Sequence, residues 1–183
     1  MSRHPLSPTP FPGVRAALSA AVIAAVTALP AAAEEGAVAE AKIHDRDGDL
    51  VGNALLHETP AGVLLHVNFA GLPPGVHGFH IHETGKCEPP FKSAGGHLMA
   101  PDTSHGYLTE NGPHLGDMPN IHVPKTGALQ LEVMTEVAEM DEQLLDADGA
   151  ALVLHANADD YRSQPSGAAG PRIACGVIEE QVE

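Results

Sequence analysis

The sequence has few basic residues: nine Lys and Arg stand against 24 Asp and Glu in 183 residues, a formal net charge of −15 at pH 7. Nucleic acids and anionic membrane surfaces attract positively charged proteins, so this chain is a poor partner for either. Beyond residue 29 it also lacks any apolar run that approaches the length of a membrane span. These two absences exclude function classes and say little about the fold.

The first apolar run belongs to a segment with the features of a secretory signal peptide. An acid-free start with two arginines precedes an almost entirely apolar stretch over residues 16–29, and Ala31-Ala32-Ala33 offers an A-x-A-like cleavage site. The alternative is an uncut membrane anchor, but the run is short for a span. We predict cleavage after Ala33, export to a bacterial periplasm or an equivalent oxidising compartment, and a mature domain of residues 34–183. That domain carries 7 basic and 24 acidic residues, a charge of −17.

Cysteine is scarce as well. The chain has two cysteines, Cys87 and Cys175, and both lie in the predicted mature domain. Two cysteines in an exported chain favour one disulfide, because oxidising compartments preserve such bonds. The alternative is a pair of free structural thiols, which fits export less well.

Helical periodicity is also missing, since no apolar stripe with a 3.6-residue period has a useful length. Period-two alternation replaces it: Val63, Leu65, Val67 and Phe69 alternate with more polar positions, as in a half-buried strand. Other short strand-like segments cover residues 37–44, 50–57, 76–82, 128–137, 151–154 and 173–178. The sequence therefore predicts an all-β domain, either a sandwich or a barrel.

Two segments without strand patterning interrupt this series. Residues 83–119 and 156–172 form stretches of 37 and 17 residues that are rich in turn-forming or polar residues. Loops of this length inside a compact domain are usually functional. Because most of the clustered histidines lie in these loops or beside them, we expect a bound metal to order them.

Histidine is what the chain has in abundance, with 12 in all. His80 and His82 lie two positions apart in a predicted strand and therefore share one face. Three histidines and an aspartate in the long loop suit a closed tetrahedral zinc site, and imidazole-rich surroundings suit Cu(II). The candidate metal ligands that follow His82 in the sequence are His97, His105, His114, Asp117 and His155. Isolated histidines are more often structural or exposed, and we treat His44, His57, His66 and His122 in that way.

Four segments together resemble the Cu/Zn superoxide dismutases, in particular their bacterial exported branch. They are GFHIHE at residues 78–83, the histidine-bearing stretch 95–117, LVLH at 152–155 and GPRIACG at 170–176. The resemblance extends over nearly the whole mature chain. One departure is Pro171, where the family often has glycine or another small residue; it concerns the details of that loop.

The resemblance implies one copper ion and one zinc ion in each subunit. Copper would be held by His80, His82, His97 and His155, and zinc by His97, His105, His114 and Asp117. His97 would then bridge the metals as an imidazolate, with one ring nitrogen on each. The implied fold is an eight-stranded Greek-key barrel or sandwich with two long functional loops.

The resemblance also implies roles for residues around the metals. Asp159 would hydrogen-bond one copper ligand and one zinc ligand, although capping its loop is the alternative. Cys87 and Cys175 would form an intrasubunit disulfide. Arg172 would attract the substrate anion, because it stays charged and offers several donors; a surface salt bridge is the alternative. His77 matches a structural histidine.

The implied activity is disproportionation of superoxide to dioxygen and hydrogen peroxide in antioxidant defence, with Arg172 and His97 as catalytic residues. A non-catalytic periplasmic copper- and zinc-binding protein is the alternative, and it would need the ligands but not Arg172. A zinc hydrolase is disfavoured, since it needs an open zinc position and this zinc set is full. The sequence contains no motif for oligomeric state, so a homodimer stays open. Four other cations, Lys86, Lys92, Lys125 and Arg162, are candidates to add to the local field, but the sequence does not place them relative to the metals.

Overall fold

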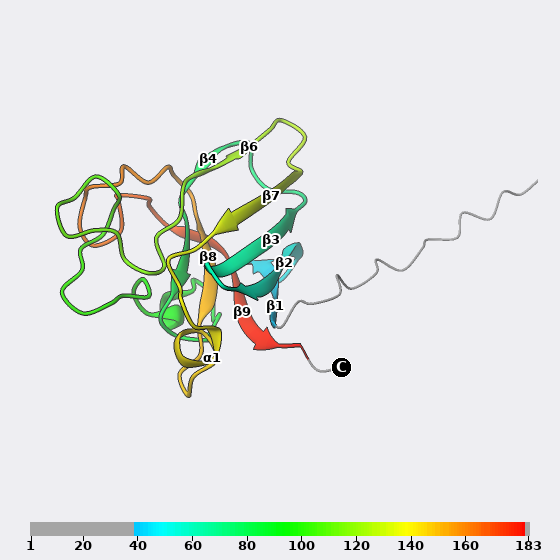
Figure 1. The fold of residues 1–183 in the computed structure, drawn as a ribbon. Coiled ribbons are helices and arrows are strands. Elements are labelled where there is room, and N and C mark those ends of the chain that lie inside the picture. Colours follow the sequence, from blue (N-terminus) through cyan, green and yellow to red (C-terminus); the bar gives the residue numbers. More distant parts are fainter. Residues whose placement is uncertain (1–38, 182–183) are drawn as a thin grey trace, which may run out of the picture. The chain divides into compact units, whose positions relative to one another are not determined.

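The computed structural model describes residues 39–181, which form an almost entirely β domain (Figure 1). The strands within this range are β1 (Ala39–Asp45), β2 (Leu50–Thr59), β3 (Gly62–Phe69), β4 (Gly75–His77), β5 (Phe79–His82), β6 (Ile121–Val123), β7 (Leu129–Met134), β8 (Ala151–His155) and β9 (Arg172–Glu180). The helical segments are a 3₁₀ turn (Lys92–Ala94) and α1 (Met140–Gln143). Within residues 39–181, no helix has the length and apolarity to cross a membrane. The predicted all-β class is confirmed, and the predicted signal peptide lies outside the described residues.

Seven strands form one antiparallel sheet in the order β5-β8-β9-β1-β2-β3-β7. The sheet curls into a half-barrel, and its arrows wrap around a common interior in Figure 1. Apolar side chains at alternate positions of the strands fill that interior. In β3, for example, Val63, Leu65, Val67 and Phe69 are buried, and the residues between them face outward. Burying one such side chain contributes about 1.5–3 kcal/mol. A shift of the strand pairing by one residue would turn all four side chains outward, so their burial fixes the register of the strand.

The segment that the sequence predicts as one strand over residues 76–82 is divided between two sheets. Its first part, β4, pairs with β6, and its second part, β5, pairs with β8. Gly78 lies at the break, and its N–H donates to the carbonyl oxygen of Asn157 rather than to a strand neighbour. This division, together with the short β6, brings the number of strands within the described residues to nine.

The two predicted loops lie together beside the β5–β8 edge of the sheet, at the left of Figure 1. The backbone N–H of His105 in the first loop donates to Gln164 Oε1 in the second across 3.0 Å. A disulfide between Cys87 and Cys175 ties the first loop to β9, with an S–S distance of 2.03 Å, as predicted. A small separate apolar cluster of Phe91, Ala94, Ala151, Val153 and Cys175 packs the loop onto the outer face of β8 and β9.

Candidate metal centre

Strand β5 supplies the first two histidines of the site. Phe79 and Ile81 point into the half-barrel core, so the alternation of the strand directs His80 and His82 to the outer face, where the first loop buries both. β8 pairs with β5 and ends at His155, where a register shift follows Leu154. Two neighbouring strands thus present three imidazoles beneath one loop.

The first loop adds His97 as a fourth ring. Backbone bridges join His82 to His97 and His80 to Asp117, so the loop runs against β5 almost like another strand. Gly116 permits this approach, because a Cβ atom there would lie 2.1 Å from the carbonyl oxygen of Ile81. The loop backbone therefore fixes the position of His97 relative to the strand histidines.

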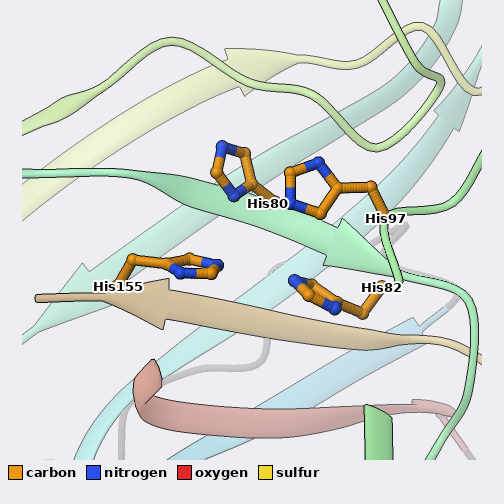
Figure 2. A group of neighbouring side chains, drawn as sticks. All are labelled: His80, His82, His97 and His155. Atoms are coloured by element: carbon orange, nitrogen blue, oxygen red, sulfur yellow. The ribbon is translucent and has the colours of Figure 1, made fainter. Parts of the chain in front are cut away.

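The four rings face one another over β5 and β8 (Figure 2). The ring centroids of His80 and His97 are 4.1 Å apart, and those of His80 and His155 are 4.9 Å apart. One nitrogen from each ring lies within 4.8 Å of those from the other three. Four converging buried imidazoles form a donor set that suits copper.

Each of these four rings has one nitrogen engaged with the protein. His80 Nε2 lies 2.7 Å from Asp159 Oδ2, and His97 Nδ1 lies 2.7 Å from Asp117 Oδ1. His82 Nδ1 lies 3.1 Å from the carbonyl oxygen of Gly95, and His155 Nδ1 lies 3.3 Å from that of Gly170. The opposite nitrogens are buried and make no hydrogen bond to any described residue: His80 Nδ1, His82 Nε2, His97 Nε2 and His155 Nε2. Buried polar atoms rarely stay unsatisfied, so this set fits a metal ion that completes it.

A second group is centred on one carboxylate oxygen. Asp117 Oδ1 lies 2.7, 2.9 and 3.7 Å from the Nδ1 atoms of His97, His105 and His114. Its other oxygen accepts the backbone N–H groups of Gly106 and His114 at 2.7 and 3.0 Å. The four side chains are all buried, and their ligand atoms lie within 4.8 Å of one another. Three imidazoles and one carboxylate are donors that fit tetrahedral zinc.

Asp159 links the two groups from outside. Its Oδ2 meets His80 Nε2 at 2.7 Å, and its Oδ1 meets His105 Nε2 at 3.0 Å. Gly167 leaves room for this contact, since a Cβ atom there would lie 1.8 Å from Asp159 Oδ1. Asn120 holds the backbone of Asp159 on both sides, through its Oδ1 and its Nδ2. The carboxylate therefore orients one ring of each group.

Burial controls protonation in the first group. It lowers the pKa of His80 to about 4 in spite of the hydrogen bond to Asp159, and it lowers the pKa of His155 to about 3 with help from the charge of His80. Burial and the nearby His97 hold the pKa of His82 well below its ordinary value. These imidazoles are therefore neutral at pH 7, which is the form that binds metal.

In the second group, carboxylates rather than burial determine the protonation of His105. Burial alone would lower the pKa of His105, but the hydrogen bonds to Asp117 and Asp159 outweigh it and raise the pKa to about 9. In return, and against their own burial, both carboxyl groups have pKa values well below their usual range because of their hydrogen bonds to the histidines. A metal ion that binds His105 must displace this proton, and it supplies the positive charge that the two carboxylates require.

Arg172 lies at the start of β9, next to the first group. Its guanidinium donates to the carbonyl oxygens of Phe91 and Gly95, and the Gly95 oxygen also faces His82 Nδ1. Burial lowers the pKa of Arg172 from its ordinary value, against the opposing charge of Glu83, but a guanidinium remains protonated at neutral pH. The side chain is thus a half-buried cation attached to the loop that carries His97.

The remaining histidines do not join either group. Both nitrogens of His77 are engaged, with the carbonyl oxygens of His155 at 2.9 Å and Pro73 at 3.0 Å. Its structural role, which the sequence suggested, agrees with these contacts. The groups of possible ligands found among the described residues also leave out His44, His57, His66 and His122.

Several supporting residues escaped the sequence reasoning. Tyr107 donates its hydroxyl to the carbonyl oxygen of Asp117 at 2.7 Å, and Tyr161 accepts the N–H of Asn120 at 2.7 Å. Arg46, in the turn after β1, donates through Nε to the carbonyl oxygen of Arg172 at 2.7 Å. The contacts of Tyr161 and Arg46 join residues 41 and 126 positions apart, and none of the three contacts has a local sequence signal.

Comparison with known proteins gives one consistent result. The model of the family described as copper/zinc superoxide dismutase matches residues 50–178. The chain is 41% identical over 167 residues to Cu-Zn superoxide dismutase 2 of Aquifex aeolicus, which covers 88% of this chain and 98% of the relative. It is 43% identical over 148 residues to the Cu-Zn superoxide dismutase of Caulobacter vibrioides, with 77% and 85% covered. A solved SOD-like protein from Bacillus subtilis superposes with a TM-score of 0.73 at 34% identity, covering 75% of this chain and 96% of that one.

Sequence, fold and donor geometry thus agree. The relatives in two bacteria are named as dismutases and span most of this chain, and the two histidine groups offer the donors that copper and zinc require. The chain therefore belongs to the copper/zinc superoxide dismutase family, as an enzyme of that type with copper and zinc as its cofactors.

Proposed function

We propose that this enzyme disproportionates superoxide at a copper ion that His97 joins to a zinc ion. Copper would be held by His80 Nδ1, His82 Nε2, His97 Nε2 and His155 Nε2, and zinc by the Nδ1 atoms of His97, His105 and His114 with Asp117 Oδ1. The assignment depends on one observation, that the two ring nitrogens of His97 have different surroundings. Its Nδ1 lies 2.7 Å from Asp117 Oδ1, and its buried Nε2 has no hydrogen-bond partner.

The copper would supply one-electron redox chemistry, oxidising one superoxide to dioxygen and reducing the next to peroxide, while the zinc has no redox role. The protein's part is to bring in an anion and to provide a proton. Arg172 would attract the anion, since its guanidinium is half-buried and hydrogen-bonded to the loop that carries His97. His97 Nε2 would hold a proton for the departing peroxide whenever that nitrogen is not engaged as a ligand.

Asp159 would orient the reacting groups. A metal-bound imidazole needs a partner on its other nitrogen to fix its ring, and Asp159 provides one for His80 and one for His105. This role is supported further by Asn120, which holds the Asp159 backbone in place. A simple loop cap would not need both carboxylate oxygens turned toward histidine nitrogens.

Export to the periplasm completes the proposal. The Cys87–Cys175 disulfide suits an oxidising compartment, and the bacterial relatives belong to the same family. In that setting the enzyme would remove superoxide outside the cytoplasm. The substrate is a small anion, which agrees with a centre enclosed by loops rather than an extended groove.

The decisive experiment combines metal analysis with a superoxide assay on the purified mature protein. We expect one copper and one zinc per chain, and a rate of superoxide removal that follows copper content when zinc is held constant. Full loading with both metals but no superoxide removal would contradict the proposal. That result would instead favour a metal-binding protein without catalysis.

A further inference from the structure

Tyr161 has a backbone conformation that is uncommon for a residue with a side chain. Its φ is 60°, in the left-handed region that favours glycine. It lies in the second loop, two residues after Asp159, the carboxylate that links the two histidine groups. A non-glycine residue keeps such a conformation only where the surrounding contacts require it, and residues of this kind gather at functional sites. The contacts that hold Tyr161 are all made with the surroundings of the metal centre.

Tyr161 is connected to Asp159 in two ways. Its backbone N–H donates to Asp159 Oδ1 across 2.6 Å, and the same oxygen lies 3.0 Å from His105 Nε2. Its hydroxyl accepts the backbone N–H of Asn120 across 2.7 Å. Asn120 in turn holds the backbone of Asp159, through Oδ1 at 2.8 Å and through Nδ2 at 2.9 Å. The three residues thus close a ring of hydrogen bonds around the Asp159 carboxylate.

Tyr107 makes the corresponding connection to Asp117 in the first loop. Its hydroxyl donates to the carbonyl oxygen of Asp117 across 2.7 Å. The preceding residue, Gly106, donates its backbone N–H to Asp117 Oδ2 across 2.7 Å. Residues 106 and 107 therefore hold Asp117 by its backbone and by its carboxylate at the same time.

The two phenol rings also contact each other. Their centroids are 5.8 Å apart and their planes are at 70°, an edge-to-face arrangement that aromatic pairs favour. The backbone supports this contact, since the N–H of Leu108 donates to the carbonyl oxygen of Tyr161 across 3.2 Å. Gly106 permits the close approach, because a Cβ atom there would lie 2.1 Å from that oxygen. The tyrosine pair thus joins the two loops, with each ring connected to one of the two carboxylates.

We propose that Tyr161 and Tyr107 are positioning residues of the metal centre, and that they act through Asp159 and Asp117 respectively. The roles of both tyrosines rest on the proposed function, since they require copper and zinc in the two histidine groups. Metal-bound imidazoles depend on the groups behind them, and loss of such a partner typically weakens metal binding 10- to 100-fold. The two hydroxyls lie one step further out, so we expect each to contribute at the lower end of that range.

The two tyrosines should differ in which metal they affect. Asp159 contacts His80 in one group and His105 in the other, so Tyr161 acts on both metals. Asp117 belongs to the second group alone, so Tyr107 acts mainly on zinc. This difference separates positioning from a general loss of stability, which would not discriminate between the metals.

The test uses the mature protein loaded with copper and with Co²⁺ in place of zinc. Co²⁺ is the probe because its visible absorption changes with ligand geometry, whereas Zn²⁺ has no such spectrum. Replacement of either tyrosine by phenylalanine removes one hydroxyl and keeps the ring. Tyr161→Phe should change both the cobalt absorption and the copper(II) electron paramagnetic resonance spectrum. Tyr107→Phe should change the cobalt absorption and leave the copper spectrum close to that of the wild type. In competition with a chelator, each variant should bind Zn²⁺ about tenfold more weakly.

Thr135→Val is the matched control. It removes a buried hydroxyl that donates to the carbonyl oxygen of Val63 at 3.1 Å, at a position outside both loops and both ligand groups. This variant should keep the wild-type spectra and zinc affinity even where it lowers the free energy of unfolding. Wild-type spectra and zinc affinity in Tyr161→Phe would overturn the proposal, and so would equal changes in Thr135→Val.

Asn120→Ala gives a second route to the same carboxylate and leaves both phenols in place. It should reproduce the spectral changes of Tyr161→Phe, so it decides the matter even if that variant fails to fold. Combined with Tyr161→Phe, it should weaken Zn²⁺ binding by less than the product of the two single effects, because both act through Asp159. Independent, multiplying effects would contradict a shared role. None of these measurements uses superoxide, so a fully loaded protein without activity would contradict the proposed function and not the role of the tyrosines.

Discussion

His97 and Asp117 are joined through a single atom pair, Nδ1 and Oδ1, at 2.7 Å. The same ring lies beside His80, with centroids 4.1 Å apart, and its other nitrogen, Nε2, is buried without a hydrogen-bond partner among the described residues. The two nitrogens of an imidazole point in different directions, so one ring can belong to two donor groups at once. His97 is the member common to both groups of possible ligands among the described residues.

Replacing the shared ring should therefore affect both metals. In His97→Ala we expect lower zinc content, a changed copper absorption spectrum and loss of superoxide removal. In Asp117→Asn we expect zinc to be lost preferentially, because Asp117 belongs to one group alone. Metal content per chain, measured beside the visible spectrum, distinguishes these outcomes. If His97→Ala kept both the copper spectrum and the activity of the wild type, the bridge would be ruled out.

Metal removal should leave a protein whose stability depends on pH in two directions. Between pH 6.5 and 4, unfolding lets His80 and His155 take up protons that burial denies them, because their folded pKa values are about 4 and 3. The metal-free protein should thus lose stability as pH falls through this window. Above pH 6.5, His105 has the opposite effect: its folded pKa of about 9 means that its contribution is lost as pH rises toward 9.

Urea unfolding of metal-free protein at a series of pH values checks this expectation. The free energy of unfolding should be highest near pH 6.5 and should fall on both sides. Glu132→Gln, at an exposed position on β7, is a suitable control and should follow the same curve. A free energy of unfolding that rises steadily from pH 6.5 to 4 would contradict the assignment of buried, neutral histidines.

The disulfide should stabilise the fold and hold the first loop in place. Cys87 and Cys175 are 88 residues apart in sequence, for which the chain-entropy model gives about 4–5 kcal/mol. We expect Cys87→Ser with Cys175→Ser to lower the free energy of unfolding by that order. Because Phe91 and Gly95 follow Cys87 in the same loop and accept hydrogen bonds from Arg172, activity should fall as well. Denaturant unfolding of the metal-loaded double variant is the measurement, and stability equal to the wild type would refute it.

Local sequence patterns predicted the fold class and most strands, because burial alternates strictly along strands such as β3. They did not reveal the break at Gly78, since β4 and β5 continue the same strand-like pattern while pairing with different partners. The choice of partner depends on β6, which is a strand of three residues with little pattern of its own.

The candidate ligands could be named from sequence because spacing and resemblance mark them. Their supports could not be named in the same way. Arg46 contacts the Arg172 carbonyl across a sequence separation of 126 residues, and Asn120 contacts Asp159 across 39. Such contacts arise only when the sheet closes and the loops pack, and no pattern near either residue records them.

Export makes a prediction about the chain's own ends. If residues 1–33 are a signal peptide, the native protein should begin near Glu34. Intact-mass spectrometry of protein from a periplasmic extract checks this, with a cytoplasmic extract as the control. A native soluble protein that begins at Met1 and stays in the cytoplasm would contradict export.

Arg172 leads to the last prediction, because it shares a pocket with two other cations. Arg46, Lys92 and Arg172 line a pocket of about 330 Å³ together with Pro90, Gly170 and Pro171, with no acidic residue among them. Lys92 was one of the four candidate cations named from the sequence, and Arg46 was not among them. In a chain with a net charge of −15, such a patch concentrates positive potential beside the metal centre.

Removing these charges should slow the capture of superoxide without removing metal. At low ionic strength and matched copper content, we expect Arg172→Ala to lower the rate about tenfold and Arg46→Gln about twofold, since local fields change association rates by such factors. Lys125→Gln, on the exposed β6–β7 connection outside this pocket, should have little effect.

The rate deficits of Arg172→Ala and Arg46→Gln should both shrink as salt rises, because the screening length falls to about 8 Å at 0.15 M. The comparison within each salt concentration matters, since the overall negative charge gives the wild type its own salt dependence. Equal rates for Arg172→Ala and wild type would make Arg172 purely structural, anchoring the loop through Phe91 and Gly95.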